Sequence, residues 1–435
     1  MQKEQVCLVL LLICGSLYGE DATMFRGNLE HTGIYQGPGV PKFNGLKWKF
    51  HTSGMVVGSP SIADGVVFVG STDGNLYAID AQSGLQKWKF EVKSRIPSTP
   101  ALARGVVYFS AYDGYLYAVE AATGALKWKF QTGGERRFAG KHLHGTQPVT
   151  ETMPDPFDCY LSSPVVWNET VYFGSGDTNI YALNAASGAL RWKFKTGDVV
   201  HASPAIADGT LFIGSWDSYF YAIDAASGTE KWRFKTGEDH ETYNQVGIQS
   251  SAAVADGMVY FGCRDSHLYA LEMRTGEKKW AFDAKGSWVV GSPAVRGERV
   301  YFPTSDSSLL YEVDSKSGKV LRSVGFNRWY LYSSPALAGD ALFIGSTQGK
   351  LVAVGLSQMQ PVWSYETEAS KQHAPEYVKP DGTPNGPALF HSDFYDDMVT
   401  GVERTMSMGS ILSSPIVVNN VVYVGSADGN VYALM

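Results

Sequence analysis

One short pattern recurs eight times in the 435 residues of this chain, and it constrains the fold more than any other feature. Each copy begins with a serine or threonine, usually followed by proline, and an acid or its replacement stands fourteen residues later. The paired landmarks are Ser59 and Asp73, Thr99 and Asp113, Ser163 and Asp177, Ser203 and Asp217, Ser251 and Asp265, Ser292 and Asp306, Ser334 and Gln348, and Ser414 and Asp428. Such constant spacing predicts one repeated structural unit.

Each copy contains two apolar runs, a Ser/Thr-Gly turn and, in most copies, a tryptophan four residues after the glycine of that turn. These segments suit four short strands joined by tight turns. Four-stranded units with a period of about 40 residues are typical of β-propeller blades. We therefore predict an all-β fold, in which residues 42–435 form one eight-bladed β-propeller of four-stranded antiparallel blades.

The two ends of the repeat region complement each other. The last copy stops at Met435, before its own tryptophan strand, whereas residues 46–50 precede the first copy and supply a spare strand with Trp48. An unpaired strand edge invites aggregation. We therefore predict that the N-terminal strand is the outer strand of the last blade and closes the ring.

Seven tryptophans occupy equivalent places and have a structural explanation. A large ring on the outer strand fills the gap between neighbouring blades, so that its truncation should cost about 3–5 kcal/mol. Arg322 stands at this position in the sixth copy. The repeated acids are interpreted as turn formers. The predicted blade-docking residues are Trp48, Trp88, Trp128, Trp192, Trp232, Trp280 and Trp363.

The N-terminus predicts export. Residues 1–19 have the short apolar run and following small residues of a signal peptide. Cys14 lies in a segment faintly similar to a lipoprotein cleavage box, which leaves a lipid anchor open as an alternative. Residues 20–41 form a lead-in before the propeller. We therefore expect a protein of the periplasm or cell envelope.

Composition excludes several classes of function. The net charge of −7 argues against nucleic-acid binding. No apolar run beyond the N-terminus is long enough to span a membrane, so an integral membrane protein is not expected. Cys159 and Cys263 lie two copies apart, and we predict two separate thiols and no disulfide.

Three connections between copies are much longer than the others and follow Trp128, Trp232 and Trp363. In a propeller, such a link leads from an outer strand to the innermost strand of the next blade, so all links should emerge on one face around the channel mouth. The inserts lie near residues 133–160, 238–247 and 366–410. None has a recognisable metal-ligand spacing, and no metal site is predicted. The candidate binding residues in the inserts are His142, His144, His391, Phe394 and Tyr395.

The lining of the channel mouth can be predicted from the residues two and four positions before each landmark serine or threonine. No carboxylate occupies either position in any copy. Calcium needs six to eight oxygen ligands, normally with carboxylates among them. Aromatic and polar side chains suit recognition of a peptide, a sugar or a protein edge. The candidate residues at the mouth are Arg95, His201, Gln249, Trp288, Tyr330 and Tyr332, and no catalytic residue is predicted.

The repeated segment Gly-Ser-x-Asp-Gly-x-Leu-Tyr-Ala-Ile-Asp-Ala-x-Ser/Thr-Gly-x-x-x-Trp-x-Phe resembles the pyrroloquinoline quinone (PQQ) type of propeller repeat over residues 46–435. Two kinds of protein share this repeat. Quinoprotein dehydrogenases hold PQQ and calcium at the propeller mouth, use an Asp as base and often carry two adjacent cysteines. The second kind comprises non-enzymatic propellers similar to BamB, the envelope lipoprotein that helps to assemble outer-membrane β-barrels. This chain has no adjacent cysteine pair.

These observations favour a non-catalytic, BamB-like scaffold without a cofactor. We expect a monomer that binds an envelope protein or peptide through the channel mouth and the long inter-blade loops. One alternative stays open from the resemblance: a PQQ- and calcium-dependent alcohol or sugar dehydrogenase. A second alternative is a propeller that binds a carbohydrate or another polymer.

Overall fold

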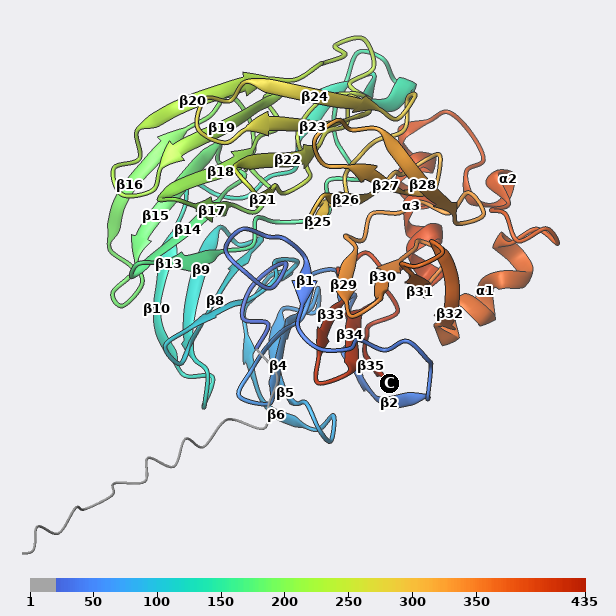
Figure 1. Cartoon of the computed structure of the whole chain (residues 1–435), viewed down its shortest axis with the longest axis horizontal. Coiled ribbons are helices and arrows are strands. Elements are labelled where there is room, and N and C mark those ends of the chain that lie inside the picture. Colours follow the sequence, from blue (N-terminus) through green and yellow to red (C-terminus); the bar gives the residue numbers. More distant parts are fainter. Residues whose placement is uncertain (1–20) are drawn as a thin grey trace, which may run out of the picture.

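Eight antiparallel sheets stand around a central axis in the computed structural model, which describes residues 21–435 (Figure 1). The predicted signal peptide and Cys14 lie outside these residues. Each sheet is one blade, and seven blades are formed by four consecutive strands; a further short strand, β1 (Ile34–Tyr35), pairs in parallel with the seventh. The predicted eight-bladed propeller is therefore confirmed.

The strands follow the repeat copy by copy. Blades 1 to 4 consist of β3 (Ser61–Ala63), β4 (Val66–Gly70), β5 (Asn75–Asp80) and β6 (Gln86–Glu91); β7 (Ala101–Ala103), β8 (Val106–Ala111), β9 (Tyr115–Glu120) and β10 (Leu126–Gln131); β13 (Val165–Trp167), β14 (Thr170–Gly174), β15 (Asn179–Asn184) and β16 (Leu190–Lys195); and β17 (Ala205–Ala207), β18 (Thr210–Gly214), β19 (Tyr219–Asp224) and β20 (Glu230–Lys235). Blades 5 to 8 consist of β21 (Ala253–Ala255), β22 (Met258–Gly262), β23 (His267–Glu272) and β24 (Lys278–Asp283); β25 (Ala294–Arg296), β26 (Arg299–Pro303), β27 (Leu309–Asp314) and β28 (Val320–Gly325); β29 (Ala336–Ala338), β30 (Ala341–Gly345), β31 (Lys350–Gly355) and β32 (Gln360–Glu366); and β33 (Ile416–Val418), β34 (Val421–Gly425), β35 (Asn430–Leu434) and β2 (Leu46–His51). The middle strands of each blade are apolar and buried, and they form the core between blades.

The last blade takes its outer strand from the N-terminal side of the chain. Strand β2 pairs antiparallel with β35, and Trp48 lies opposite Ala433. The backbone N–H of Met435 donates to the carbonyl of Gly45 at 3.0 Å, so the pairing continues to the last residue. This pairing confirms the predicted closure of the ring, which leaves no open edge between the first and last blades.

The tryptophans dock neighbouring segments of the ring against each other. Each indole Nε1 donates to a backbone carbonyl at 2.7–3.1 Å; six acceptors lie in the next blade, and Trp363 donates to Val40 of the lead-in. Arg322 replaces the indole in blade 6 and donates to Ser357 at 2.8 Å. The ring of Trp48 covers Gly84, where a Cβ would lie 2.7 Å from the indole. The turn glycine of the repeat is therefore needed both for its positive φ and for ring contact.

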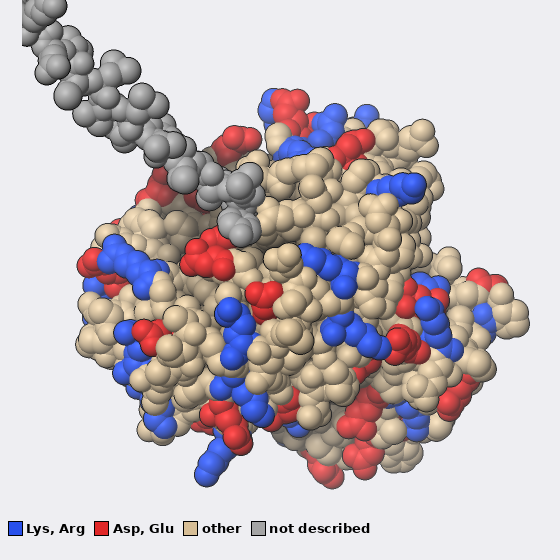
Figure 2. All heavy atoms as spheres, turned by 90° about the horizontal axis from the view of Figure 1, so that it is seen from below, with Lys and Arg blue, Asp and Glu red and all other residues tan. Residues whose placement is uncertain are grey.

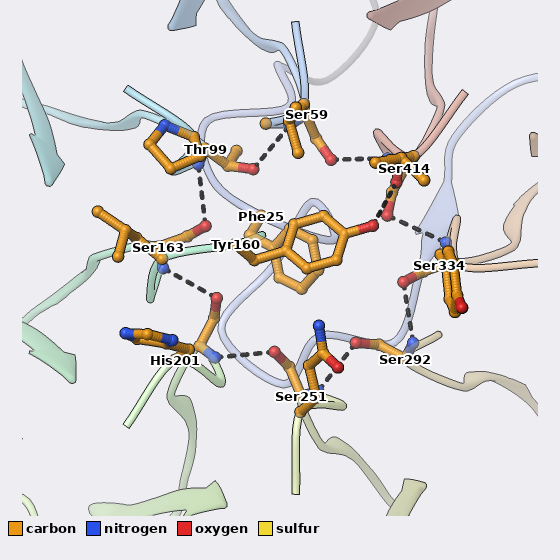
Figure 3. Close-up of a pocket in the computed structure, with 18 of the residues that line it drawn as sticks. Phe25, Ser59, Thr99, Tyr160, Ser163, His201, Ser251, Ser292, Ser334 and Ser414 are labelled. Carbon is orange, nitrogen blue, oxygen red and sulfur yellow. Dashed lines mark hydrogen bonds between the residues drawn. The ribbon is translucent and has the colours of Figure 1, made fainter. Parts of the chain in front are cut away.

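The landmark serines and threonine form a closed ring of hydrogen bonds around the axis (Figure 3). The backbone N–H of each one donates to the side-chain hydroxyl of the next, over distances of 2.8–3.2 Å, and Ser414 donates back to Ser59. A hydroxyl is therefore required in every copy, because it satisfies the first N–H of the adjacent blade.

Most of the repeated acids stabilise turns, as the sequence predicts. In six copies, the carboxylate accepts from the N–H two residues on and from the tyrosine hydroxyl four residues on, the latter at 2.5–2.8 Å. In four of these copies, those of Asp73, Asp177, Asp217 and Asp265, it also accepts from a backbone N–H of the preceding outer loop and so ties three chain segments together. Asp306 differs from these six acids.

The lead-in forms a floor across the end of the channel opposite the inserts. Its carbonyls accept hydrogen bonds from the innermost strands of blades 1, 2, 4, 5, 6 and 7, from Ile62 to Leu337. Arg26 is buried beneath the ring, where its guanidinium donates to the carbonyls of Pro293 at 3.0 Å and Pro335 at 2.6 Å. Burial lowers the pKa of Arg26 to about 10. The sequence identifies the lead-in but not this role.

The inserts carry the remaining elements. The first has the hairpin β11 (Ala139–Lys141) and β12 (Thr152–Pro154) with the short helix η1 (Leu143–Gly145). The third is expected to be a loop, and that expectation is wrong, because it folds into α1 (Glu368–Tyr377), α2 (Gly386–Leu389) and α3 (Tyr395–Ser407). Thr367 caps α1, and α3 buries one apolar face.

Two further expectations concern cysteines and charge. Cys159 and Cys263 are free thiols, as predicted. On the face in Figure 2, acidic and basic side chains are interspersed over the surface. None of the helices within residues 21–435 has the length and apolar character that a membrane span requires.

Candidate functional site

Three inserts meet over one end of the channel and form what we call the cap, residues 133–160, 238–247 and 366–410. The first and third are joined by a parallel bridge between Gln147 and Phe394, and Tyr395 donates through its hydroxyl to the carbonyl of Pro154 at 2.7 Å. The first and second are joined by His144, whose backbone N–H donates to Thr242 at 2.7 Å. The predicted convergence of the inserts around the mouth is therefore present.

The channel below the cap is plugged from both ends. Phe25 of the lead-in and Tyr160 of the first insert lie inside the hydroxyl ring (Figure 3). The remaining cavity is only about 40 Å³, enough for one or two water molecules. All eight residues two positions before the landmark hydroxyls line it, as predicted: Val57, Pro97, Leu161, His201, Gln249, Val290, Tyr332 and Leu412.

His201 is held between two carboxylates of the first insert. Its Nδ1 lies 2.7 Å from Asp158 Oδ1, its Nε2 lies 3.5 Å from Glu135 Oε2, and all three side chains are buried. Burial alone would lower the pKa of His201, but Asp158 and Glu135 raise it to about 10. The imidazole is therefore charged at neutral pH, and the first insert is held to blade 4 by a buried ion cluster.

A second ion cluster lies beside the first, deep in the mouth. The Arg264 guanidinium pairs with Asp155 at 2.6 Å, and it lies 3.7 Å from the centre of the Trp288 ring and 4.8 Å from Trp216. His144 Nε2 lies 3.2 Å from the other oxygen of Asp155. Burial would raise the pKa of Asp155, but Arg264 and then His144 hold it far below its ordinary value. These charges are satisfied within the chain.

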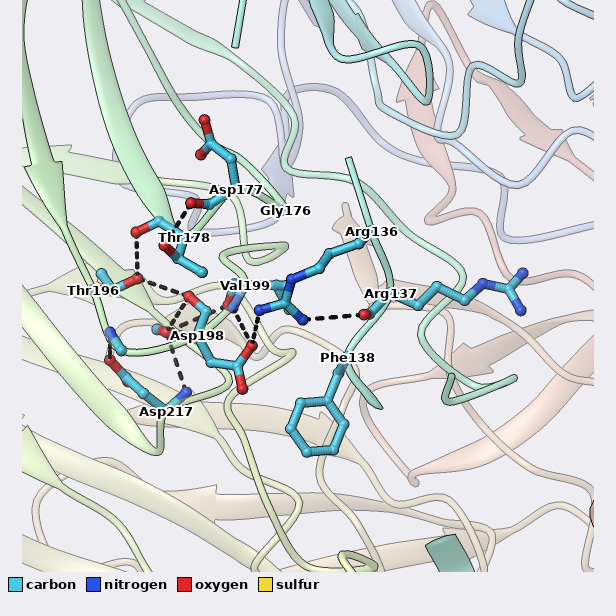
Figure 4. A network of polar contacts seen from close by, with 12 residues as sticks. Arg136, Arg137, Phe138, Gly176, Asp177, Thr178, Thr196, Asp198, Val199 and Asp217 are labelled. Atoms are coloured by element: carbon cyan, nitrogen blue, oxygen red, sulfur yellow. Dashed lines mark hydrogen bonds and ion pairs between the residues drawn. The ribbon is translucent and has the colours of Figure 1, made fainter. Parts of the chain in front are cut away.

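The start of the first insert is fastened at the surface by a third polar network (Figure 4). Arg136 pairs with Asp198 in the loop after β16 at 2.7 Å, and Arg137 points away from that loop. The backbone N–H of Gly197 donates to Asp217 at 2.7 Å, which holds the same loop to the next blade. The first insert is therefore anchored to blades 3 and 4 before it enters the mouth.

An open pocket of about 400 Å³ remains between the cap and blades 5 to 7, and we call it the mouth pocket. All three inserts contribute to it, together with the links that precede blades 6 and 7. Burial, and then the carboxylate of Asp306, raise the pKa of Tyr330 to about 12, so its hydroxyl stays neutral. Its lining residues are His144, Gly145, Thr146, Phe157, Asn244, Gly286, Trp288, Asp306, Tyr330, Tyr332, Phe390, Ser392, Asp393 and Met398.

The candidate residues from the sequence fall into three groups. Trp288, Tyr330, Tyr332 and His144 line the mouth pocket. His201 and Gln249 are buried below it, where Gln249 donates to the carbonyl of Phe157 at 3.0 Å. The others lie elsewhere: Arg95, His391 and Phe394 are exposed, and His142 and Tyr395 are partly buried in the inserts.

Sequence reasoning misses Arg264 and Trp216, which stand one position before a repeated acid. This position reaches the mouth from the turn between the second and third strands of a blade. The second copy has Tyr112 at this position, and the remaining copies have smaller residues such as Thr72, Gly176 and Ser305. A comparison of this column across the eight copies would have revealed Arg264 and Trp216 together with Tyr112.

The comparisons with known proteins agree with the repeat. A family model described as outer membrane protein assembly factor BamB matches residues 44–149, 147–284 and 243–435. Among solved structures, BamB from Moraxella catarrhalis is 16% identical, with 90% of this chain and 97% of that chain covered and a TM-score of 0.63. No curated protein matches the chain.

Two enzymes have the same fold. A europium-containing methanol dehydrogenase is 13% identical, with 95% of this chain and 98% of that chain covered and a TM-score of 0.71. The quinohemoprotein alcohol dehydrogenase from Comamonas testosteroni is 15% identical, with 95% of this chain and 80% of that chain covered and a TM-score of 0.69. At such identities the likeness extends to the fold alone.

Proposed function

Because the chain belongs to the PQQ-type propeller family whose model is described as outer membrane protein assembly factor BamB, we propose that it is an exported, non-catalytic scaffold of the cell envelope. In this proposal, the cap binds an envelope protein or peptide. The rigid propeller holds the three inserts in fixed positions, so that a partner can bind them without first ordering them.

The observation that carries this proposal is an apolar surface at the join of the first and third inserts. Phe394 is 58% exposed, and Val149, which lies two residues after its bridge partner Gln147, is 44% exposed. Exposed apolar side chains that gather on a scaffolded loop are typical of protein interfaces. Both segments are fixed by hydrogen bonds, so a partner would not have to order them.

The charge of the mouth pocket supports a role without PQQ. PQQ carries three carboxylates, whereas this pocket is lined by two aspartates and by no lysine or arginine. Arg264 lies behind Trp288 and is already paired with Asp155. The residues present therefore do not fit a trianionic quinone.

The requirements of calcium lead to the same proposal. The buried carboxylates of the first insert, Glu135, Asp155 and Asp158, are paired with His201, Arg264 and His144. Within residues 21–435, no three side chains of His, Cys, Asp or Glu gather as metal ligands. A divalent cation that used these carboxylates would have to displace their internal partners.

Site-specific photocrosslinking tests the proposed function. A photoreactive phenylalanine analogue at Phe394 should capture a distinct envelope protein or peptide in cells. The matched control is the same analogue at Leu85, which is 70% exposed on the turn before β6, away from the cap. Equal capture from both positions, or none from Phe394, would contradict binding through the cap.

Addition of PQQ with calcium tests the enzymatic alternative. Purified protein should show no saturable binding of PQQ and no dye-linked oxidation of alcohols or sugars. Micromolar PQQ binding that is lost on chelation of calcium would favour the dehydrogenase.

A further inference from the structure

The mouth pocket combines aromatic rings with carboxylates. Five aromatic side chains line its volume of about 400 Å³, namely Phe157, Trp288, Tyr330, Tyr332 and Phe390. Two carboxylates, Asp306 and Asp393, are also on its wall, and no lysine or arginine is. Aromatic faces carry partial negative charge, so these rings and the two carboxylates attract a cation.

Asp306 is available to a ligand because the turn that carries it is one residue longer than its equivalents. Five residues separate β26 from β27, whereas four separate β22 from β23. Leu310 therefore stands four residues after Asp306, where six other copies have the tyrosine that binds the acid. The hydroxyl of Thr304 accepts from the N–H of Leu309 instead and stabilises the turn.

The carboxylate of Asp306 consequently does not bind a tyrosine hydroxyl as the equivalent acids do. Among residues 21–435 it accepts a hydrogen bond from Ser305 Oγ, at 2.5 Å, and it forms no ion pair. Asp393 reaches the pocket from the third insert, and only its backbone carbonyl is used, by Gln147 at 2.8 Å. Neither acid is neutralised within the part of the chain that the structure describes.

Basic side chains near the pocket do not supply the missing charge. Arg264 contacts Trp288 but is paired with Asp155. Arg328 and Lys379 line a neighbouring cavity of about 300 Å³, which shares Asp306 and Tyr330 with the mouth pocket. These two side chains line that neighbouring cavity and not the mouth pocket, whose wall carries the two acids and the rings.

We propose that the mouth pocket receives the guanidinium of an arginine side chain from the partner that the cap binds, and this inference rests on the proposed function. A guanidinium is planar, stacks on aromatic faces and donates two parallel hydrogen bonds to a carboxylate. The chain already holds one guanidinium in this way, since Arg264 lies against two indole rings and pairs with a carboxylate.

Calorimetric titration of the full chain with capped peptides tests the proposal. The probe is acetyl-Ala-Arg-Ala-amide, and its matched control has citrulline, which keeps the shape of arginine without its charge. The arginine peptide should bind at least about tenfold more tightly than the citrulline peptide, because charge-assisted bonds and cation–π contacts are both lost in citrulline. Agmatine, a free guanidinium compound, should bind more weakly than the peptide.

Two isosteric variants locate the binding. Asp306→Asn and Asp393→Asn should each weaken binding of the arginine peptide by about tenfold. Asp340→Asn is the control, because Asp340 is exposed in the turn beside the lead-in, on the opposite face. Circular dichroism should show equal folding of all three variants.

Four results would overturn the proposal. These are equal binding of the arginine and citrulline peptides, no binding up to millimolar concentration, unchanged binding by both pocket variants, and agmatine binding as tight as that of the peptide, which would assign the pocket to a small free guanidinium compound. Crosslinking at Phe394 separates failure of the pocket from failure of the proposed function. If Phe394 still captures a partner in the Asp306→Asn variant, and calorimetry shows no preference for the arginine peptide over the citrulline peptide, the proposed pocket is refuted and the proposed function stands.

Discussion

Replacement of Trp48 by alanine should destabilise the propeller by about 4 kcal/mol. The indole is 8% exposed, lies over Gly84 of blade 1 and donates to Ala81 at 2.9 Å. Loss of a buried aromatic side chain costs about 3–5 kcal/mol, and the hydrogen bond contributes about 1 kcal/mol of that total. Because Trp48 lies on β2, the same change loosens the contact that closes the ring.

Two further variants separate the contributions of ring and hydrogen bond. Trp48→Phe keeps most of the apolar contact and should cost about 1–2 kcal/mol, since the carbonyl of Ala81 loses its donor. Leu46→Ala lies on the same strand but is 41% exposed, so it should cost less than about 1 kcal/mol.

Urea unfolding followed by far-UV circular dichroism measures these differences without depending on tryptophan fluorescence. A cost for Trp48→Phe equal to that for Trp48→Ala would show that the hydrogen bond, and not ring packing, docks the blades. A cost for Trp48→Ala below about 1 kcal/mol would refute the docking argument altogether.

Three other predictions concern charge, turns and the released acid. The pKa of His201 is raised to about 10. The charged imidazole therefore stabilises the protein fully below the ordinary histidine pKa of 6.5, and this stabilisation is lost as the pH rises towards 10. Urea midpoints should fall over this pH window in the natural protein but not in His201→Gln. Gly65→Ala should cost about 1 kcal/mol from its positive φ alone, whereas Gly84→Ala should cost clearly more because the new methyl group meets the indole; equal urea midpoints would refute that contact. Asp265→Ala should lower stability by about 2 kcal/mol in the same assay, whereas Asp306→Ala should leave it unchanged, and a matching loss in both would show that Asp306 still supports its turn.

The architecture of the ring can be predicted from the repeat alone. A constant spacing of hydroxyl, acid and tryptophan predicts the number of blades, the strands in each and the closure by residues 46–50. The prediction holds because the same contact between neighbouring blades recurs along the chain: Trp88 covers Gly124 just as Trp48 covers Gly84. Local pattern and global fold therefore agree in all but the sixth and seventh copies.

The composition of the cap depends on contacts between distant segments. Asp155 meets Arg264 across 109 residues, and Phe394 pairs with Gln147 across a still longer separation. Neither contact belongs to the repeat, so no periodicity in the sequence predicts it. The inserts are read as loops from sequence because their hydrophobic pattern is short, and α3 gains its stability from packing on its neighbours.

The same reason explains the floor and the mouth pocket. Residues 21–41 lack a repeat, and their order comes from carbonyls that accept hydrogen bonds from six separate blades. The freedom of Asp306 is visible in the sequence only as a tyrosine displaced by one position, from four to five residues after the acid. Its consequence depends on which side chains the ring brings around it, because rings and carboxylates from distant segments form one pocket only after the blades have closed.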